Sequence, residues 1–208
     1  MSSSEQLLLA HRQKLLACTQ CPNMIGPVVA GSPVLTKILL IGQAPGDKEG
    51  FYAKPFAWTA GKTLFKWFEQ IGLNEQSFRQ RVYMAAVCRC FPGKNPKGGD
   101  RVPDGIEISN CSVWLNAEMA LLKPNLILPV GKLAIMQILR FNKLSDVIGK
   151  VHAATYHGHA VDVIPLPHPS GLSTWHRTEP GLTLLQSALA QIQRHPAWQK
   201  ITHTFNQY

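Results

Sequence analysis

The chain has 208 residues, of which 45% are hydrophobic, 16% are charged and 8% are aromatic. A chain of this length and apolar content can bury a sizeable core, and its charged fraction is too low for a disordered tail or a coiled coil. Lysine and arginine outnumber aspartate and glutamate by 21 to 12, which gives a net charge of +9 and favours a polyanionic partner. We therefore expect one globular domain over residues 1–208.

Neither a secretion signal nor a membrane span is expected. His11, Arg12 and Lys14 interrupt the first helical pattern, unlike the continuous apolar region of a signal peptide. The longest apolar stretches, such as residues 38–41, have the length of a strand. We expect a soluble, cytoplasmic protein. In that reducing compartment, five cysteines favour a metal site over a disulfide framework.

Hydrophobic periodicity predicts alternating helices and strands. Helices are expected over residues 5–16, 59–71, 106–122, 131–140 and 181–194, and strands over residues 37–41, 82–87, 125–130, 151–156 and 160–166. The intervening segments 18–33 and 93–104 are rich in proline, glycine or polar residues and are expected to be irregular. This alternation predicts the α/β class, as a three-layer α/β/α sandwich with a central, mostly parallel sheet. Ligands of such sheets bind beyond the carboxyl ends of the strands.

Four cysteines have the pattern of a shared metal site. Cys18 and Cys21 form a close pair, and Cys90 and Cys111 complete a thiolate set that suits zinc or an iron–sulfur cluster. Cys88 lies at the end of the predicted strand and is expected in the core, whereas Cys90 begins the following loop and is the better ligand. Such a site would hold the predicted N-terminal helix against the loop that begins at Cys90.

Two loops that follow predicted strands carry candidate ligand-binding groups. Residues 42–46, with the sequence GQAPG, place glycine at both ends, so that the backbone can approach a ligand closely. Phe56 follows as an aromatic ring suited to stacking. Far along the chain, residues 166–177 offer the imidazole of His168 on a basic loop.

These pieces together resemble the uracil-DNA glycosylase superfamily, especially its iron–sulfur branches, families 4 and 5. The similar segments are GQAPG at residues 42–46, KPF at residues 54–56 with Ala60 and Gly61, and HPS at residues 168–170. The resemblance runs from Cys18 to the last predicted helix. It implies a monomeric DNA glycosylase of base excision repair that acts on deaminated bases, uracil first and hypoxanthine second. It also implies a 4Fe–4S cluster on the four cysteines, with zinc as the alternative occupant.

The resemblance also implies a role for each candidate site residue. Phe56 stacks on the extruded base, and His168 donates to the base oxygen that gains charge as the bond breaks. The remaining base-binding candidates are Gly42, Gln43, Ala44 and Asn95, of which Gln43 and Asn95 would read the base edge or hold the water. The DNA-binding candidates are Leu172, as a wedge, and Ser170 and Arg177, as phosphate contacts.

Two departures from the family pattern keep other functions open. Family 4 carries a uracil-reading asparagine where this chain has alanine and valine at residues 85–87, as in family 5. Family 5 carries an aspartate shortly after the phenylalanine, where this chain has Trp58 and Thr59, so no carboxylate for activating water is evident. A catalytically weak or inactive protein that binds damaged or single-stranded DNA is the alternative of a different class. A zinc-stabilised nucleotide-binding module is the third possibility.

Overall fold

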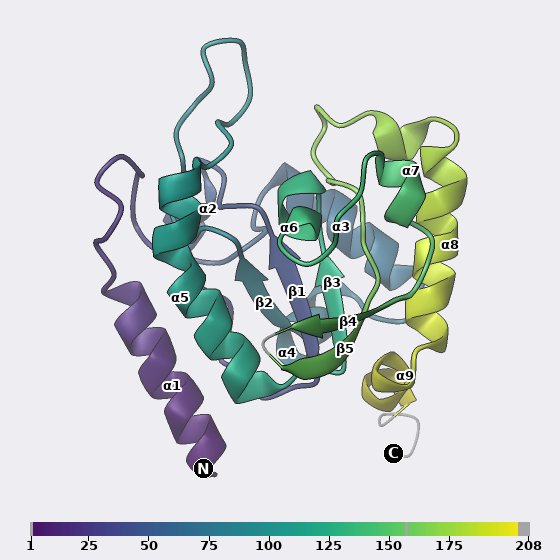
Figure 1. Ribbon diagram of the computed structural model, residues 1–208, viewed down its shortest axis with the longest axis horizontal. Coiled ribbons are helices and arrows are strands. Elements are labelled where there is room, and N and C mark those ends of the chain that lie inside the picture. Colours follow the sequence, from purple (N-terminus) through teal and green to yellow (C-terminus); the bar gives the residue numbers. More distant parts are fainter. Residues whose placement is uncertain (1, 157, 204–208) are drawn as a thin grey trace.

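The computed structural model describes residues 2–156 and 158–203. A five-stranded sheet lies at its centre in the order β2-β1-β3-β5-β4 (Figure 1). The pairs β1–β2, β1–β3 and β3–β5 are parallel, and β4–β5 is an antiparallel pair. The strands are β1 (Ile38–Gly42), β2 (Tyr83–Ala86), β3 (Leu126–Pro129), β4 (His152–Tyr156) and β5 (His159–Val163). The mostly parallel α/β sheet is therefore confirmed.

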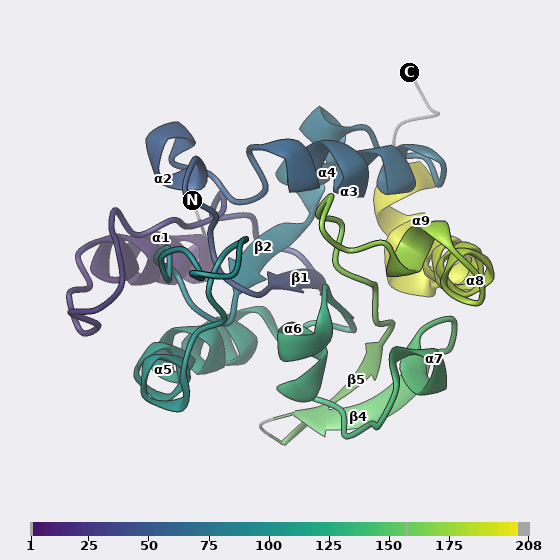
Figure 2. The same cartoon turned by 90° about the horizontal axis from the view of Figure 1, so that it is seen from above.

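Helices cover both faces of the sheet (Figure 2). The longer helices are α1 (Ser3–Leu16), α3 (Thr59–Glu69), α5 (Gly105–Leu122), α8 (Gly181–Arg194) and α9 (Pro196–His203). The shorter ones are α2 (Glu49–Tyr52), α4 (Glu75–Arg81), α6 (Lys132–Met136), α7 (Leu144–Val147) and the 3₁₀ turn Trp175–Arg177. In the part of the chain that the structure describes, no helix is both long enough and apolar enough to cross a membrane.

Strand β1 shows why the fold has three layers. Its residues are fully buried, and successive side chains point to opposite faces of the sheet. Ile38 and Leu40 pack into a core with α3, α8 and α9, whereas Leu39 and Ile41 pack into a second core with α1 and α5. A strand that is apolar at every position is therefore covered on both sides, as expected for a parallel sheet.

Several predicted boundaries are wrong for local reasons. Helix α3, expected to reach residue 71, ends at Glu69, three residues before Gly72 adopts a positive φ of 97°. The helix expected to reach residue 140 ends at Met136. By contrast, α8 has the predicted bounds, and Asp104 caps α5 by accepting from the backbone N–H groups of residues 106 and 107.

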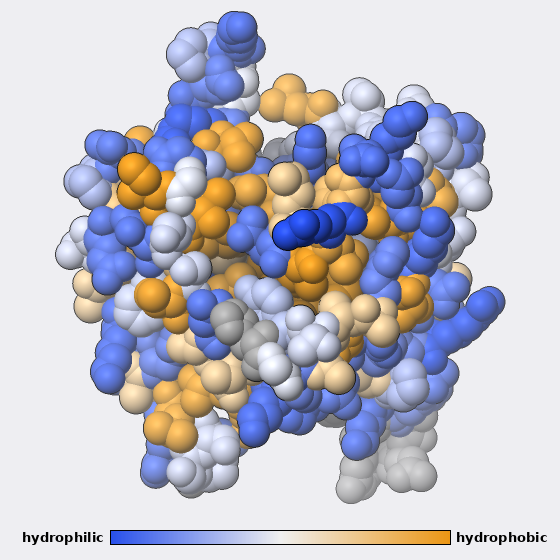
Figure 3. All heavy atoms as spheres, viewed as in Figure 1, coloured by the Kyte–Doolittle hydropathy of each residue, from blue (hydrophilic) through white to orange (hydrophobic). Residues whose placement is uncertain are grey.

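The parallel strands bring their following loops together. Strands β1, β2 and β3 run the same way, so the segments after them meet at the upper edge of the sheet in Figure 1. Residues 167–174 reach the same edge because Val130 and Leu166 are bridged in parallel. Hydrophilic side chains cover the loop that protrudes above α5 at this edge (Figure 3). The predicted ligand-binding loops are thus neighbours in space.

Candidate functional site

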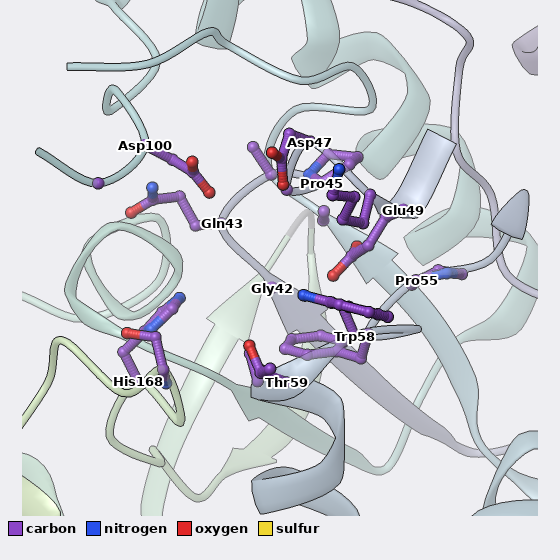
Figure 4. Close-up of a pocket in the computed structure, with 18 of the residues that line it drawn as sticks. Gly42, Gln43, Pro45, Asp47, Glu49, Pro55, Trp58, Thr59, Asp100 and His168 are labelled. Carbon is purple, nitrogen blue, oxygen red and sulfur yellow. The ribbon is translucent and has the colours of Figure 1, made fainter. Parts of the chain in front are cut away.

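A cleft of about 820 Å³ opens at the carboxyl edge of the sheet (Figure 4). Residues 42–49 form its floor after β1, and residues 55–60 form one wall. Residues 98–100 and 168–173 contribute to the rest of the lining. Segments from three regions that are far apart in the sequence therefore surround one cavity, as expected for a ligand site of an open α/β sheet.

The structure brings most of the predicted site residues into this cleft. Those that line it are Gly42, Gln43, Ala44, Phe56, His168, Ser170 and Leu172. Asn95 and Arg177 do not line it. The Asn95 amide oxygen instead accepts from the backbone N–H of Lys97 at 2.9 Å, and the Arg177 Nε lies 3.4 Å from Nε2 of His176. Both side chains thus contact residues of their own loops.

The Phe56 ring lies against the end of β1. A Cβ atom at Gly42 would come within 3.0 Å of Cε2 and Cζ of the ring, so glycine is what allows this contact. Phe56 has a φ of 52°, a left-handed conformation that is uncommon for an aromatic residue. Gly61 is required beside it, because a Cβ there would overlap the Phe56 carbonyl oxygen. The ring is therefore held in one position in the wall of the cleft, against Gly42 of its floor.

Arg79 of α4 fixes the segment that carries Phe56. Its Nη1 donates to the carbonyl oxygen of Pro55 at 2.9 Å, and its Nη2 donates to that of Phe56 at 3.1 Å. Its Nε is paired with Glu75 at 2.8 Å, and the guanidinium lies 4.6 Å from the centre of the Phe65 ring. Sequence reasoning missed Arg79 because α4 was not predicted.

The His168 imidazole is held in a defined orientation. The backbone N–H of Ser170 donates to Nδ1 at 3.3 Å, so the neutral ring carries its proton on Nε2. The ring packs on Gly131, whose φ is 86° and whose position leaves no room for a side chain. Burial lowers the pKa of His168, and the neighbouring His176 lowers it further, whereas Asp100 acts in the opposite direction. The imidazole is therefore a neutral donor at neutral pH.

Glu49 is a carboxylic acid in the cleft that sequence reasoning missed. Figure 4 shows its side chain pointing into the cavity, above Trp58. Burial raises the pKa of Glu49 to about 7, although the backbone N–H groups of Phe56 and Gly46 and the charge of Arg79 oppose the rise. The only available signal was an acidic residue three positions after GQAPG. The cleft thus contains a carboxyl group that titrates near neutral pH.

A second cavity, of about 440 Å³, is lined by all four predicted ligand cysteines, Cys18, Cys21, Cys90 and Cys111. Cys88 does not line it and is fully buried in the core beside Cys111. Burial and the three neighbouring thiols raise the pKa of Cys90 to about 11, so a bound cation is needed to stabilise four thiolates there. Among the described residues, no three Cys, His, Asp or Glu side chains are grouped as a single ion would require. The donor set itself is the all-thiolate set of zinc and iron–sulfur sites.

The three-layer fold, the cleft at its strand ends and the thiol-lined cavity define an α/β ligand-binding protein with a separate cysteine site. A family profile described as "Uracil DNA glycosylase superfamily" matches residues 29–193. The chain belongs to this superfamily. Its match to the type-4 uracil-DNA glycosylase of Archaeoglobus fulgidus is 33% identical over 141 residues and covers 65% of this chain and 66% of the relative, just under two thirds.

Two further relatives match over longer segments. The type-4 uracil-DNA glycosylase of Thermotoga maritima is 29% identical over 181 residues, which cover 83% of this chain and 86% of the relative. The type-5 uracil-DNA glycosylase of Pyrobaculum aerophilum is 24% identical over 198 residues, which cover 77% of this chain and 81% of the relative. Similarity to both types agrees with the mixed motifs of the sequence.

Proposed function

We propose that this protein is a DNA glycosylase of base excision repair that hydrolyses the N-glycosidic bond of deoxyuridine in DNA. The observation that carries the proposal is one cleft that holds both a fixed aromatic ring, Phe56, and a neutral imidazole donor, His168. Membership of the uracil DNA glycosylase superfamily and the type-4 relatives support the same reaction.

Hypoxanthine is the second candidate base. Ala85 and Ala86 line the cleft at the end of β2. Two methyl groups at this wall add no hydrogen-bonding group that would select the edge of uracil, so a larger base with a similar oxygen is a reasonable second substrate. Of the two predicted edge-reading residues, Gln43 lies in the cleft and Asn95 does not. We therefore propose that Gln43 is the residue that binds the edge of the base.

The chemistry requires little beyond well-placed donors. As the glycosidic bond breaks, the sugar gains positive charge and the departing base gains negative charge. Phe56 stacks on the base, while Nε2 of His168 donates a hydrogen bond to the base oxygen on which this charge develops. Loss of one such donor costs about 2.7 to 4 kcal/mol of barrier, or roughly 100- to 1000-fold in rate. A base in a duplex must first be turned out of the helix.

Leu172 is placed to occupy the gap that an extruded base leaves. Its side chain is 79% exposed, it lines the cleft, and it touches the opposite loop at Gly99. An apolar wedge of this kind is common in proteins that unstack DNA. Ser170 at the rim and Arg177 on the adjacent turn are proposed to hold phosphates, which would give affinity without sequence preference.

We also propose that Cys18, Cys21, Cys90 and Cys111 hold a 4Fe–4S cluster, with zinc as the alternative. The cavity with four free thiols supports the proposal, as does the all-cysteine donor set. When bound, the cluster supplies a crosslink between the segment after α1, the segment after β2, and α5. Iron and sulfide analysis with a visible absorption spectrum after anaerobic purification tests it. Colourless protein containing one equivalent of zinc would contradict it.

The test of the activity is single-turnover base release from oligonucleotides that carry uracil or hypoxanthine, both single-stranded and duplex. Wild type and His168→Ala are compared at equal metal content. We expect wild type to release uracil and the variant to be slower by roughly 100-fold or more. DNA binding without release of either base would support the inactive binding protein, and full activity in the variant would remove His168 from the mechanism.

A further inference from the structure

Three aromatic side chains at or beside the cleft of Phe56 and His168, called the base cleft from here on, remain exposed. Phe51 is 86% exposed, Tyr52 is 41% exposed and Trp58 is 43% exposed. In residues 2–156 and 158–203 they are the aromatic side chains of Phe, Tyr and Trp that are left exposed, and all three lie within eight positions of the sequence. Exposed aromatic surface costs free energy in water, so a cluster of it indicates an interaction site.

The three rings form one continuous surface, which we call the aromatic platform. The Tyr52 and Trp58 rings are stacked, with centroids 5.9 Å apart and planes 20° apart. The Phe51 ring meets that of Tyr52 edge to face, with centroids 5.2 Å apart. Because the rings pack on one another, little side-chain freedom is left to lose when a ligand binds.

The aromatic platform continues directly into the base cleft. Trp58 lines the cleft, and Figure 4 shows its ring below Glu49 and across the cavity from His168. A nucleotide strand whose target base lies on Phe56 would therefore pass over the platform with its next bases. Three exposed lysines, Lys48, Lys54 and Lys62, occur in the same segment and suit a phosphate backbone.

We propose that Phe51, Tyr52 and Trp58 bind unpaired bases next to the target by stacking, so that the protein prefers single-stranded to duplex DNA. This inference rests on the proposed function, because the cleft must hold the target base. Unpaired bases expose their faces and stack on aromatic side chains with little sequence preference. Bases that flank an extruded nucleotide in a duplex remain paired and stacked, so they cannot use the platform.

The first test measures binding to DNA that contains no uracil. Fluorescence anisotropy gives the Kd of wild type for a single-stranded thymidine oligonucleotide and for a duplex of the same length at one salt concentration. The double variant Phe51→Ala/Tyr52→Ala leaves the cleft residues in place. We expect its single-strand Kd to rise by at least about fivefold and its duplex Kd to change by less than about twofold.

Two controls separate stacking from other effects. Phe51→Leu keeps an apolar side chain but removes the ring, so it should weaken single-strand binding, in the same direction as the double variant. Ile106→Ala removes an apolar side chain that is 74% exposed at the start of α5, and it should change neither Kd. Unchanged single-strand affinity in the double variant, an equal loss for duplex, or wild-type affinity in Phe51→Leu would overturn the proposal.

The second test measures uracil release from single strands and duplexes under single-turnover conditions with limiting DNA. We expect wild type to favour the single strand and the double variant to lose most of that preference while still releasing uracil from duplex. The two proposals fail differently. If no base is released, the proposed activity fails but the binding test still decides on the platform. If release is normal and the strand preference is unaltered in the variant, only the platform is wrong.

Discussion

Replacing Glu49 by glutamine should stabilise the protein at alkaline pH and have little effect at acid pH. Burial raises the pKa of Glu49 from 4.5 to about 7, so the folded state favours the neutral acid. An acid whose pKa is higher in the folded than in the unfolded state contributes most stability below pH 4.5, and that contribution is lost as the pH rises through 7. Glutamine cannot ionise and therefore avoids this loss.

The size of the effect follows from the shift. A rise from 4.5 to about 7 is about 2.5 pKa units, and at 1.36 kcal/mol per unit this is about 3 kcal/mol. Because the carboxyl group keeps partial contact with solvent, we expect about 2 kcal/mol. For a domain of about 200 residues, this corresponds to a Tm increase of roughly 4 to 8 °C near pH 8.

The assay is thermal unfolding of wild type and Glu49→Gln, followed by circular dichroism at equal metal content near pH 8 and near pH 4.5. The Tm difference should be present at the higher pH and nearly vanish at the lower one. Glu69→Gln, an exposed glutamate at the end of α3, is the matched control and should show no such dependence. An equal Tm change at both pH values would mean that the carboxyl is not forced toward neutrality by its burial.

Three further substitutions test other parts of the site. Arg79→Ala removes two donors to backbone carbonyls, so it should destabilise the fold by about 2 kcal/mol and slow uracil release. Arg79→Lys should recover part of the stability and part of the rate, measured by unfolding and single-turnover assays. Cys90→Ser should abolish iron binding and Cys88→Ser should retain it, by metal analysis. Gly131→Ala should slow base release by roughly tenfold or more, because its Cβ would come within 2.9 Å of Cδ2 of His168; an unchanged rate would contradict the packing argument.

The architecture could be predicted from the sequence because its strands are short apolar runs with clear limits. The residues of β1 are all apolar up to Gly42, and α8 carries a strong pattern of buried positions. The segment of α4 was missed for the opposite reason. It has seven residues, of which one, Phe78, is buried, so periodicity gives almost no signal. Short helices of this kind are formed by packing and not by their own pattern.

The site was predictable where it consists of motifs and unpredictable where it depends on burial. GQAPG, Phe56 and His168 were found because each follows a recognisable strand or motif, and the structure places all three in one cleft. Glu49 became significant only when folding buried it, and Arg79 only when α4 placed it beside the Phe56 carbonyl. Asn95 shows the converse, because the sequence made it a base-binding candidate and it lies outside the cleft.

Hydrogen-bonded segments lie between the cavity of the four cysteines and the base cleft, so loss of the proposed metal should affect the proposed activity. Two hydrogen bonds join the segment after Cys21 to the segment around Cys90. The backbone N–H of Ile25 donates to the carbonyl oxygen of Phe91, and that of Val29 donates to the carbonyl oxygen of Arg89, both at 2.7 Å. Val29 itself lines the base cleft. The same loop continues from Cys90 to residues 98–100 of the cleft.

Removal of the proposed metal should therefore lower the proposed activity by loosening these segments, and not by removing a group that takes part in the reaction. His168, Phe56 and their supports lie on other elements and should remain in place. We expect metal-depleted protein to bind single-stranded DNA more weakly, so that KM rises by a larger factor than kcat falls. We also expect it to become more sensitive to proteolysis between residues 18 and 33. A loss confined to kcat, with unchanged affinity and proteolysis, would indicate instead that the metal acts in the chemical step.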